Sequence, residues 1–309
     1  ALDVISDIVL HSTFDKDELD RERGVVLQEI GQANDTPDDI IFDLFQETAY
    51  PDQPLGRPIL GTEDIVGSMS RRALVDYIDL QYGADRMVVA AAGNLDPEDF
   101  VRRVEDVFAG VTASTAPPPA AGEYRGGELR DARDLEQAHL VMGFEGVGFS
   151  DDDYYPLAVL STVLGGGMSS RLFQEIRERR GLAYSVYSFS SAFSDSGLFG
   201  LYAGTGEEHL DELVGAVRRE LLRISEELIT EDELTRSRAQ IKAGVLMSLE
   251  STSSRAERLA RSLMIYDRIV PVGEMSQRID AVSAEDIRRV GSRILSSAPT
   301  ISAMGPIDG

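Results

Sequence analysis

Apolar positions recur along the chain at two periods, and each period predicts one kind of element. Residues 2–9 place apolar side chains three or four apart, as on one face of a helix, and Phe14, Asp15 and Glu18 resemble a staple and capping box that start the next helix. Further helices are predicted over 69–82, 155–164, 171–180, 208–227, 231–250, 254–267 and 282–295. Strands are predicted over 86–92, 138–144, 182–190 and 197–204. Because the two kinds are mixed without strict alternation, we expect an α+β fold, with an antiparallel-rich sheet and helices packed on one face.

One segment has the composition of a linker. Residues 112–122, TASTAPPPAAG, combine three prolines with small residues. Proline-rich segments of this kind are extended and semi-rigid. We therefore expect a boundary here, with a first lobe in 1–111 and a second lobe in 123–309.

The two parts resemble each other. DELDRER, from residue 17, is matched at five of seven positions by DELTRSR, which begins 215 residues later. ADRMVVAAAGNLD (84–96) parallels SAPTISAMGPID (297–308), and each run follows a helical pattern that opens on a serine, Ser70 or Ser283. Three matches in one order predict two homologous lobes that arose by duplication.

The repeat also predicts where the first lobe is incomplete. At an offset of 215, Ala1 corresponds to Ala216, whereas the second copy starts near Glu123. If the copies are equally long, the first lacks roughly 93 residues, so we expect the chain to begin inside its first lobe.

Composition narrows the classes of partner and site. The formal net charge is -24 and there is no cysteine, which disfavours nucleic acid and anionic membranes as partners and excludes disulfides and thiolate metal sites. No apolar run approaches the ~20 residues of a membrane span. No signal peptide is visible, and we predict a cytoplasmic location.

Two glutamates in RERGVVLQEI (21–30) are candidate functional residues. Glu22 and Glu29 are seven positions apart, so they share one helix face about two turns apart. Val25, Val26 and Ile30 place that face at or near a buried boundary. A partly buried carboxylate pair suits a divalent metal or general base chemistry.

The alternative is a solvated acidic stripe, or ion pairs with Arg21 and Arg23. The second copy has Ser237 and Gly244 at the matching positions, so the repeated frame does not require the carboxylates. The histidines form no HxxxH or HxxEH motif, and each by itself favours a surface or core role; they are His11, His139 and His209.

Two longer motifs carry a family resemblance. RERGVVLQEI, followed by GQANDTPDD and PLGRPILGT (54–62), resembles the insulinase, pitrilysin and mitochondrial processing peptidase family of zinc endopeptidases. GGGMSSRLFQEIRERRGLAYSVYSF (165–189) does so too, and the chain is most similar to the bacterial processing-protease branch.

The resemblance implies roles for four residues. Glu29 matches the third zinc ligand of the family, and Glu22 matches a second glutamate near the metal that assists catalysis. Arg177 and Tyr184 match an arginine and a tyrosine that grip the substrate backbone. The HxxEH motif that supplies two zinc histidines and the general base is absent from residues 1–309, and we expect it in the missing part of the first lobe.

The function that this resemblance implies is hydrolysis of extended peptides between two lobes by a zinc endopeptidase. This chain, with one zinc ligand of three, is expected to be inactive by itself. The implied partners are a peptide or unfolded-protein substrate and a second subunit, in a homodimer or a family heterodimer. Two alternatives stay open: a non-catalytic scaffold or substrate-binding subunit of the same family, and an unrelated α+β binding module.

Overall fold

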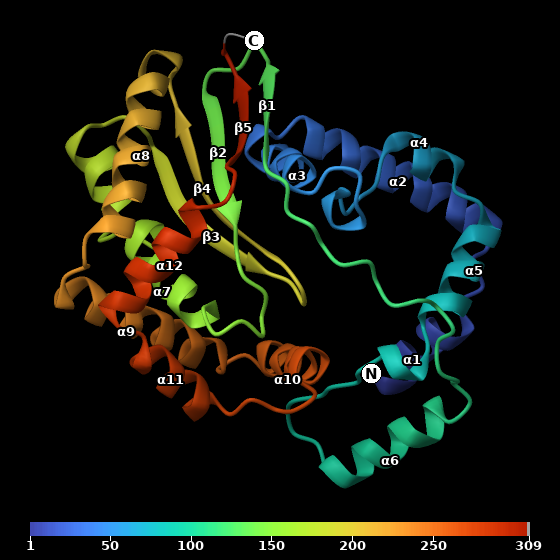
Figure 1. The fold of residues 1–309 in the computed structure, drawn as a ribbon. Coiled ribbons are helices and arrows are strands. Elements are labelled where there is room, and N and C mark those ends of the chain that lie inside the picture. Colours follow the sequence, from blue (N-terminus) through green and yellow to red (C-terminus); the bar gives the residue numbers. More distant parts are fainter. Residues whose placement is uncertain (308–309) are drawn as a thin grey trace. The chain divides into compact units, whose positions relative to one another are not determined.

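The computed structural model describes residues 1–307, and it divides into two compact units (Figure 1). The first, here called the helical unit, comprises residues 1–32, 59–119 and 248–269. The second, the sheet unit, comprises residues 33–58 and 120–247 and continues from Val270 onward. These units are defined by contacts, and the two homologous lobes with a boundary at 112–122 stay a prediction.

The helical unit consists of short helices with side-chain caps. Its elements are α1 (Leu2–His11), most of α2 (Lys16–Asn34), α4 (Glu63–Ser68), α5 (Arg71–Gln81), the 3₁₀ turn η2 (Ala84–Arg86), α6 (Pro97–Phe108) and α10 (Thr252–Tyr266). Asp15 accepts hydrogen bonds from the backbone of Asp17 and Glu18 at 2.9 and 3.2 Å, so it caps α2 as its position predicted. Ser70 caps α5 in the same way.

The strand predicted over residues 86–92 is wrong for this structure. Among the described residues, 87–92 belong to no helix or strand. A strand forms only beside a partner that accepts its hydrogen bonds, and none of the described residues pairs with this segment. Its counterpart in the repeat, β5 (Thr300–Gly305), has partners on both sides.

The sheet unit is built on five strands. They are β1 (Gly127–Ala132), β2 (Ala138–Glu145), β3 (Ser185–Ala192), β4 (Gly197–Thr205) and β5, in the spatial order β1-β5-β2-β4-β3. β1 and β5 are parallel, and the remaining neighbours are antiparallel. The α+β class and the antiparallel-rich sheet are therefore confirmed.

Helices cover both faces of this sheet. The elements are α3 (Pro37–Ala49), the 3₁₀ turn η1 (Pro54–Gly56), α7 (Tyr154–Gly165), the π-helix η3 (Phe173–Arg179), the 3₁₀ turn η4 (Glu207–His209), α8 (Leu210–Glu226), α9 (Glu231–Ser248), α11 (Val272–Ala281) and α12 (Ala284–Leu295). Within the unit, α7, α8 and α12 lie on one side of the sheet and α3 on the other (Figure 1).

The side chains of β2 show why both faces are covered. Leu140 and Met142 point into the core that α7, α8 and α12 close, whereas Val141 packs with Phe45 of α3. Successive strand residues point to opposite faces of the sheet, so a strand that is apolar throughout must be covered on both faces. The prediction of helices on a single face missed α3.

Candidate functional site

The predicted acidic pair lies on α2 and is exposed to solvent. Glu22 and Glu29 are both exposed, and Val25 between them is 45% exposed. Ile30 is the buried residue of this helix. The expectation of a partly buried pair is therefore wrong for this structure, because burial depends on which element packs on a face and not on the apolar residues adjacent in sequence.

The arginines beside Glu22 pair with other acids. Arg21 contacts Glu18 at 2.8 Å, and Arg23 contacts Asp20 at 2.5 Å. Arg23 also donates to the carbonyl oxygens of Val66 and Met69, at 3.2 and 2.7 Å. The alternative in which Glu22 pairs with Arg21 or Arg23 is therefore not found.

Neither glutamate forms an ion pair with any residue of the described part of the chain. Both carboxylates therefore keep all their acceptor positions for a ligand or for solvent.

The described residues do not by themselves form a zinc site. Within residues 1–307, no three side chains of histidine, cysteine, aspartate or glutamate come together as metal ligands. His11 lies 3.2 Å from Asp7, and His139 lies 2.8 Å from the Tyr202 hydroxyl. A protein zinc site uses three or four ligands, and Glu29 supplies at most one.

The second predicted pair lies at the end of η3, in the sheet unit. Leu172 and Ile176 are fully buried and attach this helical segment to the core. Arg177 points away from that core and is exposed, with its guanidinium 4.8 Å from the centre of the Phe173 ring. π-helical turns are rare in proteins, and those that do occur are often found at functional sites.

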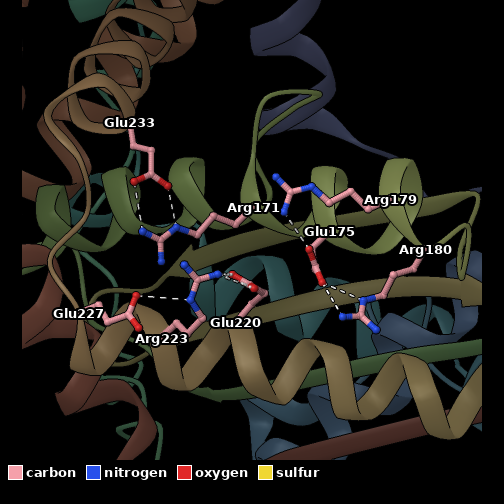
Figure 2. A network of polar contacts seen from close by, with 8 residues as sticks. All are labelled: Arg171, Glu175, Arg179, Arg180, Glu220, Arg223, Glu227 and Glu233. Atoms are coloured by element: carbon pink, nitrogen blue, oxygen red, sulfur yellow. Dashed lines mark hydrogen bonds and ion pairs between the residues drawn. The ribbon is translucent and has the colours of Figure 1, made fainter.

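Arg177 differs from the other arginines of residues 171–180. Three of these four arginines are paired with carboxylates (Figure 2). The pairs are Arg171 with Glu233, Arg179 with Glu175, and Arg180 with Glu175 and Glu212. Arg177 has no carboxylate partner among the described residues, so its five N–H donors remain available.

Tyr184 follows a turn that closes the end of η3. Gly181 has a φ of +65°, and Leu182 N donates to the carbonyl of Ile176 at 2.9 Å, which closes the end of η3. Leu182 and Ala183 are buried, whereas Tyr184 is 79% exposed. The turn therefore places an arginine and a tyrosine, both without a polar partner in residues 1–307, at the two ends of one short loop.

The two predicted pairs belong to different units. Glu22 and Glu29 lie in the helical unit, and Arg177 and Tyr184 lie in the sheet unit. The structure describes each pair within its own unit.

The partly buried ion pair of Arg171 and Glu233 was not predicted from the sequence. Arg171 donates from Nε and Nη2 to the two carboxylate oxygens at 2.7 and 3.1 Å. Burial by itself would raise the pKa of Glu233, but the bonds from Arg171 and Thr230 outweigh it and lower the pKa to about 2. The repeated DEL motif contains Glu233, but the motif gave no signal that its partner is Arg171.

Comparison with known proteins gives the family. Residues 68–241 match the model of the peptidase M16 inactive domain, and residues 1–63 match that of insulinase, peptidase family M16.

No helix of the described residues has both the length and the apolar character to cross a membrane.

Curated relatives match along nearly the whole chain. An uncharacterized zinc protease of Streptomyces coelicolor is 38% identical over 316 residues, which cover 99% of this chain and 69% of that protein. An uncharacterized zinc protease of Bacillus subtilis is 37% identical over 99% of this chain and 75% of its own length.

Solved structures show the same fold. A peptidase M16 inactive domain from Pseudomonas fluorescens superposes with a TM-score of 0.88 at 20% identity, covering 100% of this chain and 74% of that one. A chain of complex III2 from Candida albicans gives 0.87 at 21% identity, covering 98% and 74%. The motifs, the matches to both family models and the identity to these proteases together show that this chain belongs to the insulinase family of peptidases, M16.

Proposed function

We propose that this chain is the substrate-binding part of a zinc-dependent endopeptidase that holds peptides in extended form. The observation that carries the proposal is Arg177 of η3, which has no carboxylate partner in residues 1–307, together with the exposed Tyr184 seven positions later. An extended peptide presents a row of backbone carbonyl and N–H groups. The Arg177 guanidinium can donate to such a carbonyl, and the Tyr184 hydroxyl can donate to it or accept from an N–H.

Two observations support the role of zinc in this proposal, the names of the relatives and the position of Glu29. The two curated relatives described above are named zinc proteases, and Glu29 is an exposed carboxylate without an ion pair to the described residues. The described residues do not complete a zinc site, and the printed sequence has no HxxEH motif. We therefore expect the chain alone to bind zinc weakly and to bind peptides without cleaving them.

Peptide binding tests the roles of Arg177 and Tyr184. Anisotropy of a fluorescein-labelled unstructured peptide should show Arg177→Ala and Tyr184→Phe each weakening binding by about tenfold, the loss of roughly one hydrogen bond. Thermal stability should not change, because both side chains are exposed. Arg179→Ala is the matched control, since it removes an exposed arginine of η3 that is paired with Glu175. Equal binding by all variants would contradict the proposal.

The alternative is a non-catalytic scaffold or substrate-binding subunit of the same family. The lack of three clustered ligands in residues 1–307 is compatible with it. Calorimetric titration of the purified chain with zinc, which also detects weak binding, separates the two proposals. Zinc binding that Glu29→Gln weakens and Asp17→Asn does not would favour the enzyme; no binding, or binding independent of Glu29, would favour the scaffold.

The proposed partner is a second subunit, identical or homologous. Light scattering on the eluting protein measures the mass directly, and a mass of one chain at all concentrations would contradict a homodimer.

A further inference from the structure

A polar pocket lies in the sheet unit, between the start of the 171–180 helical segment, α8 and the first turns of α9. Its volume is about 220 Å³, well above the roughly 10–15 Å³ that a single water needs. The lining residues are Ser169, Ser170, Arg171, Gln174, Glu175, Arg179, Glu220, Arg223 and Glu233. It is thus a space for a group larger than one water, walled by charged side chains.

Two side chains of this pocket have buried donors without an acceptor. Ser170 is 4% exposed, and its Oγ makes no hydrogen bond to any residue that the structure describes. Arg171 donates from Nε and Nη2 to Glu233, and its Nη1 is buried without a partner in residues 1–307. Buried polar groups are nearly always satisfied, so these two atoms indicate that something else contacts them.

Arg223 of α8 supplies a third donor to this pocket. Arg223 donates from Nη1 to Glu220 and from Nε to Glu227, and its Nη2 makes no hydrogen bond within the described residues. In Figure 2, the guanidinium nitrogens of Arg171 and Arg223 that carry no dashed line are directed toward each other, between the 171–180 segment and α8. Both guanidinium groups are already paired with a carboxylate, so an acceptor in this space would satisfy the donors that these pairs leave unused.

We propose that this pocket binds a small oxyanion of the phosphate or sulfate kind, held by Arg171 Nη1, Arg223 Nη2 and Ser170 Oγ. The unsatisfied corners of both arginines can only donate, and a hydroxyl can donate, so the matching ligand is an acceptor through several oxygens. A metal cation is disfavoured, because it would meet N–H groups and not free carboxylates.

The carboxylates of the pocket do not oppose this assignment. Each of Glu175, Glu220 and Glu233 contacts an arginine at 3.1 Å or less. Three arginines and three glutamates balance in formal charge, so the ligand adds its own charge to a neutral set. The contribution of the pocket is therefore directional hydrogen bonding, which favours a ligand whose oxygens match three donors.

The direct test is calorimetric titration of the whole chain with inorganic phosphate, with sodium chloride lowered to keep the ionic strength constant. We expect saturable binding at one site and a melting temperature that rises with phosphate concentration. Ser170→Ala should weaken binding by about tenfold. It should leave the melting temperature without phosphate unchanged, because the Oγ makes no hydrogen bond to the described residues.

Arg223→Lys is the second variant, since it keeps the charge but removes the fork that donates through Nη2. It should weaken phosphate binding by about tenfold as well. Arg218→Ala removes an exposed arginine of the same helix that does not line the pocket, and it should bind phosphate as the parent chain does.

Three results would overturn the proposal. One is the absence of a saturable signal, which would mean that the pocket holds water only. Another is an equal response of all three variants, which would mean nonspecific ionic stabilisation. The last is unchanged binding by Ser170→Ala and Arg223→Lys. None of these measurements depends on peptide binding or cleavage, so the proposal is tested separately from the proposed function.

Discussion

At the residue scale, the charged side chains of this protein differ in whether a group of opposite charge in residues 1–307 pairs with them. Arg171, Arg179 and Arg180 are each paired with a glutamate, whereas Arg177 stacks on a phenylalanine and keeps its hydrogen-bond donors. Glu22 likewise forms no ion pair within the described part of the chain, although both arginines next to it do. A sequence gives the same letter to both kinds of arginine, and only the positions of the carboxylates distinguish them.

The partly buried ion pair of Arg171 and Glu233 predicts how the stability of the chain depends on pH. The pKa of Glu233 is lowered to about 2 in the folded chain from an ordinary value of 4.5. A depressed pKa means that the stabilisation is fully present above about pH 4.5 and is lost as the pH falls toward 2. The free energy of unfolding, measured in urea from pH 7 downward, should therefore fall between these two values.

Glu233→Gln is the control for that measurement, because glutamine does not titrate. Its stability at neutral pH should be lower than that of the parent chain, and the difference between them should shrink as the pH approaches 2. A constant difference across this range would show that Glu233 does not carry the effect.

At the element scale, the end of η3 depends on one glycine. Gly181 has a φ of +65°, a left-handed conformation that costs other residues roughly 1–2 kcal/mol. A Cβ there would meet nothing within 4 Å, so the cost is in the backbone alone. Gly181→Ala should lower the free energy of unfolding by about 1 kcal/mol.

Gly244 is the matched control. It lies in the interior of α9, and a Cβ would also meet nothing within 4 Å. Gly244→Ala should stabilise the chain by about 0.5–1 kcal/mol, because alanine loses less backbone entropy in a helix. Urea titration of both variants checks the pair; the same sign for both would show that the conformation at residue 181 is not the cause.

Prediction of elements succeeded where a local signal was sufficient. The apolar periodicity of residues 155–164 and 208–227 predicted α7 and α8 within two residues at each end. The apolar segment 86–92 had an equally clear signal but forms no strand. A helix satisfies its own backbone hydrogen bonds, whereas a strand depends on a neighbour.

At the scale of the whole molecule, contacts do not follow the order of the sequence. α3 precedes the proline-rich segment 112–122, yet it packs on the sheet formed by strands that follow that segment. Phe45 is 1% exposed, and Tyr50 after α3 donates to the carbonyl of Gly197 at 3.0 Å. This helix is therefore part of the core of the sheet unit.

Removal of the Phe45 ring tests that role. Phe45→Ala should destabilise the sheet unit by about 3–5 kcal/mol, through lost burial and a cavity. Hydrogen exchange read by mass spectrometry should show faster exchange in β2, β4 and β5. Ile59→Ala, at a position that is 97% exposed, should leave exchange there unchanged. Unchanged protection of the strands in Phe45→Ala would mean that α3 is not needed by the sheet.

The sequence by itself determined the family, the α+β class, most helices and their caps, because these depend on local periodicity, on cap residues and on motifs of linear spacing. It also singled out Glu22, Glu29, Arg177 and Tyr184, whose roles stay predictions. Only the tertiary structure decided that the two glutamates are exposed, that Arg177 has no carboxylate partner in residues 1–307, that Arg171 pairs with Glu233, and that α3 closes the second face of the sheet. The reason is physical: burial, ion pairing and strand pairing are relations between segments distant in sequence, and no local pattern records which segments meet.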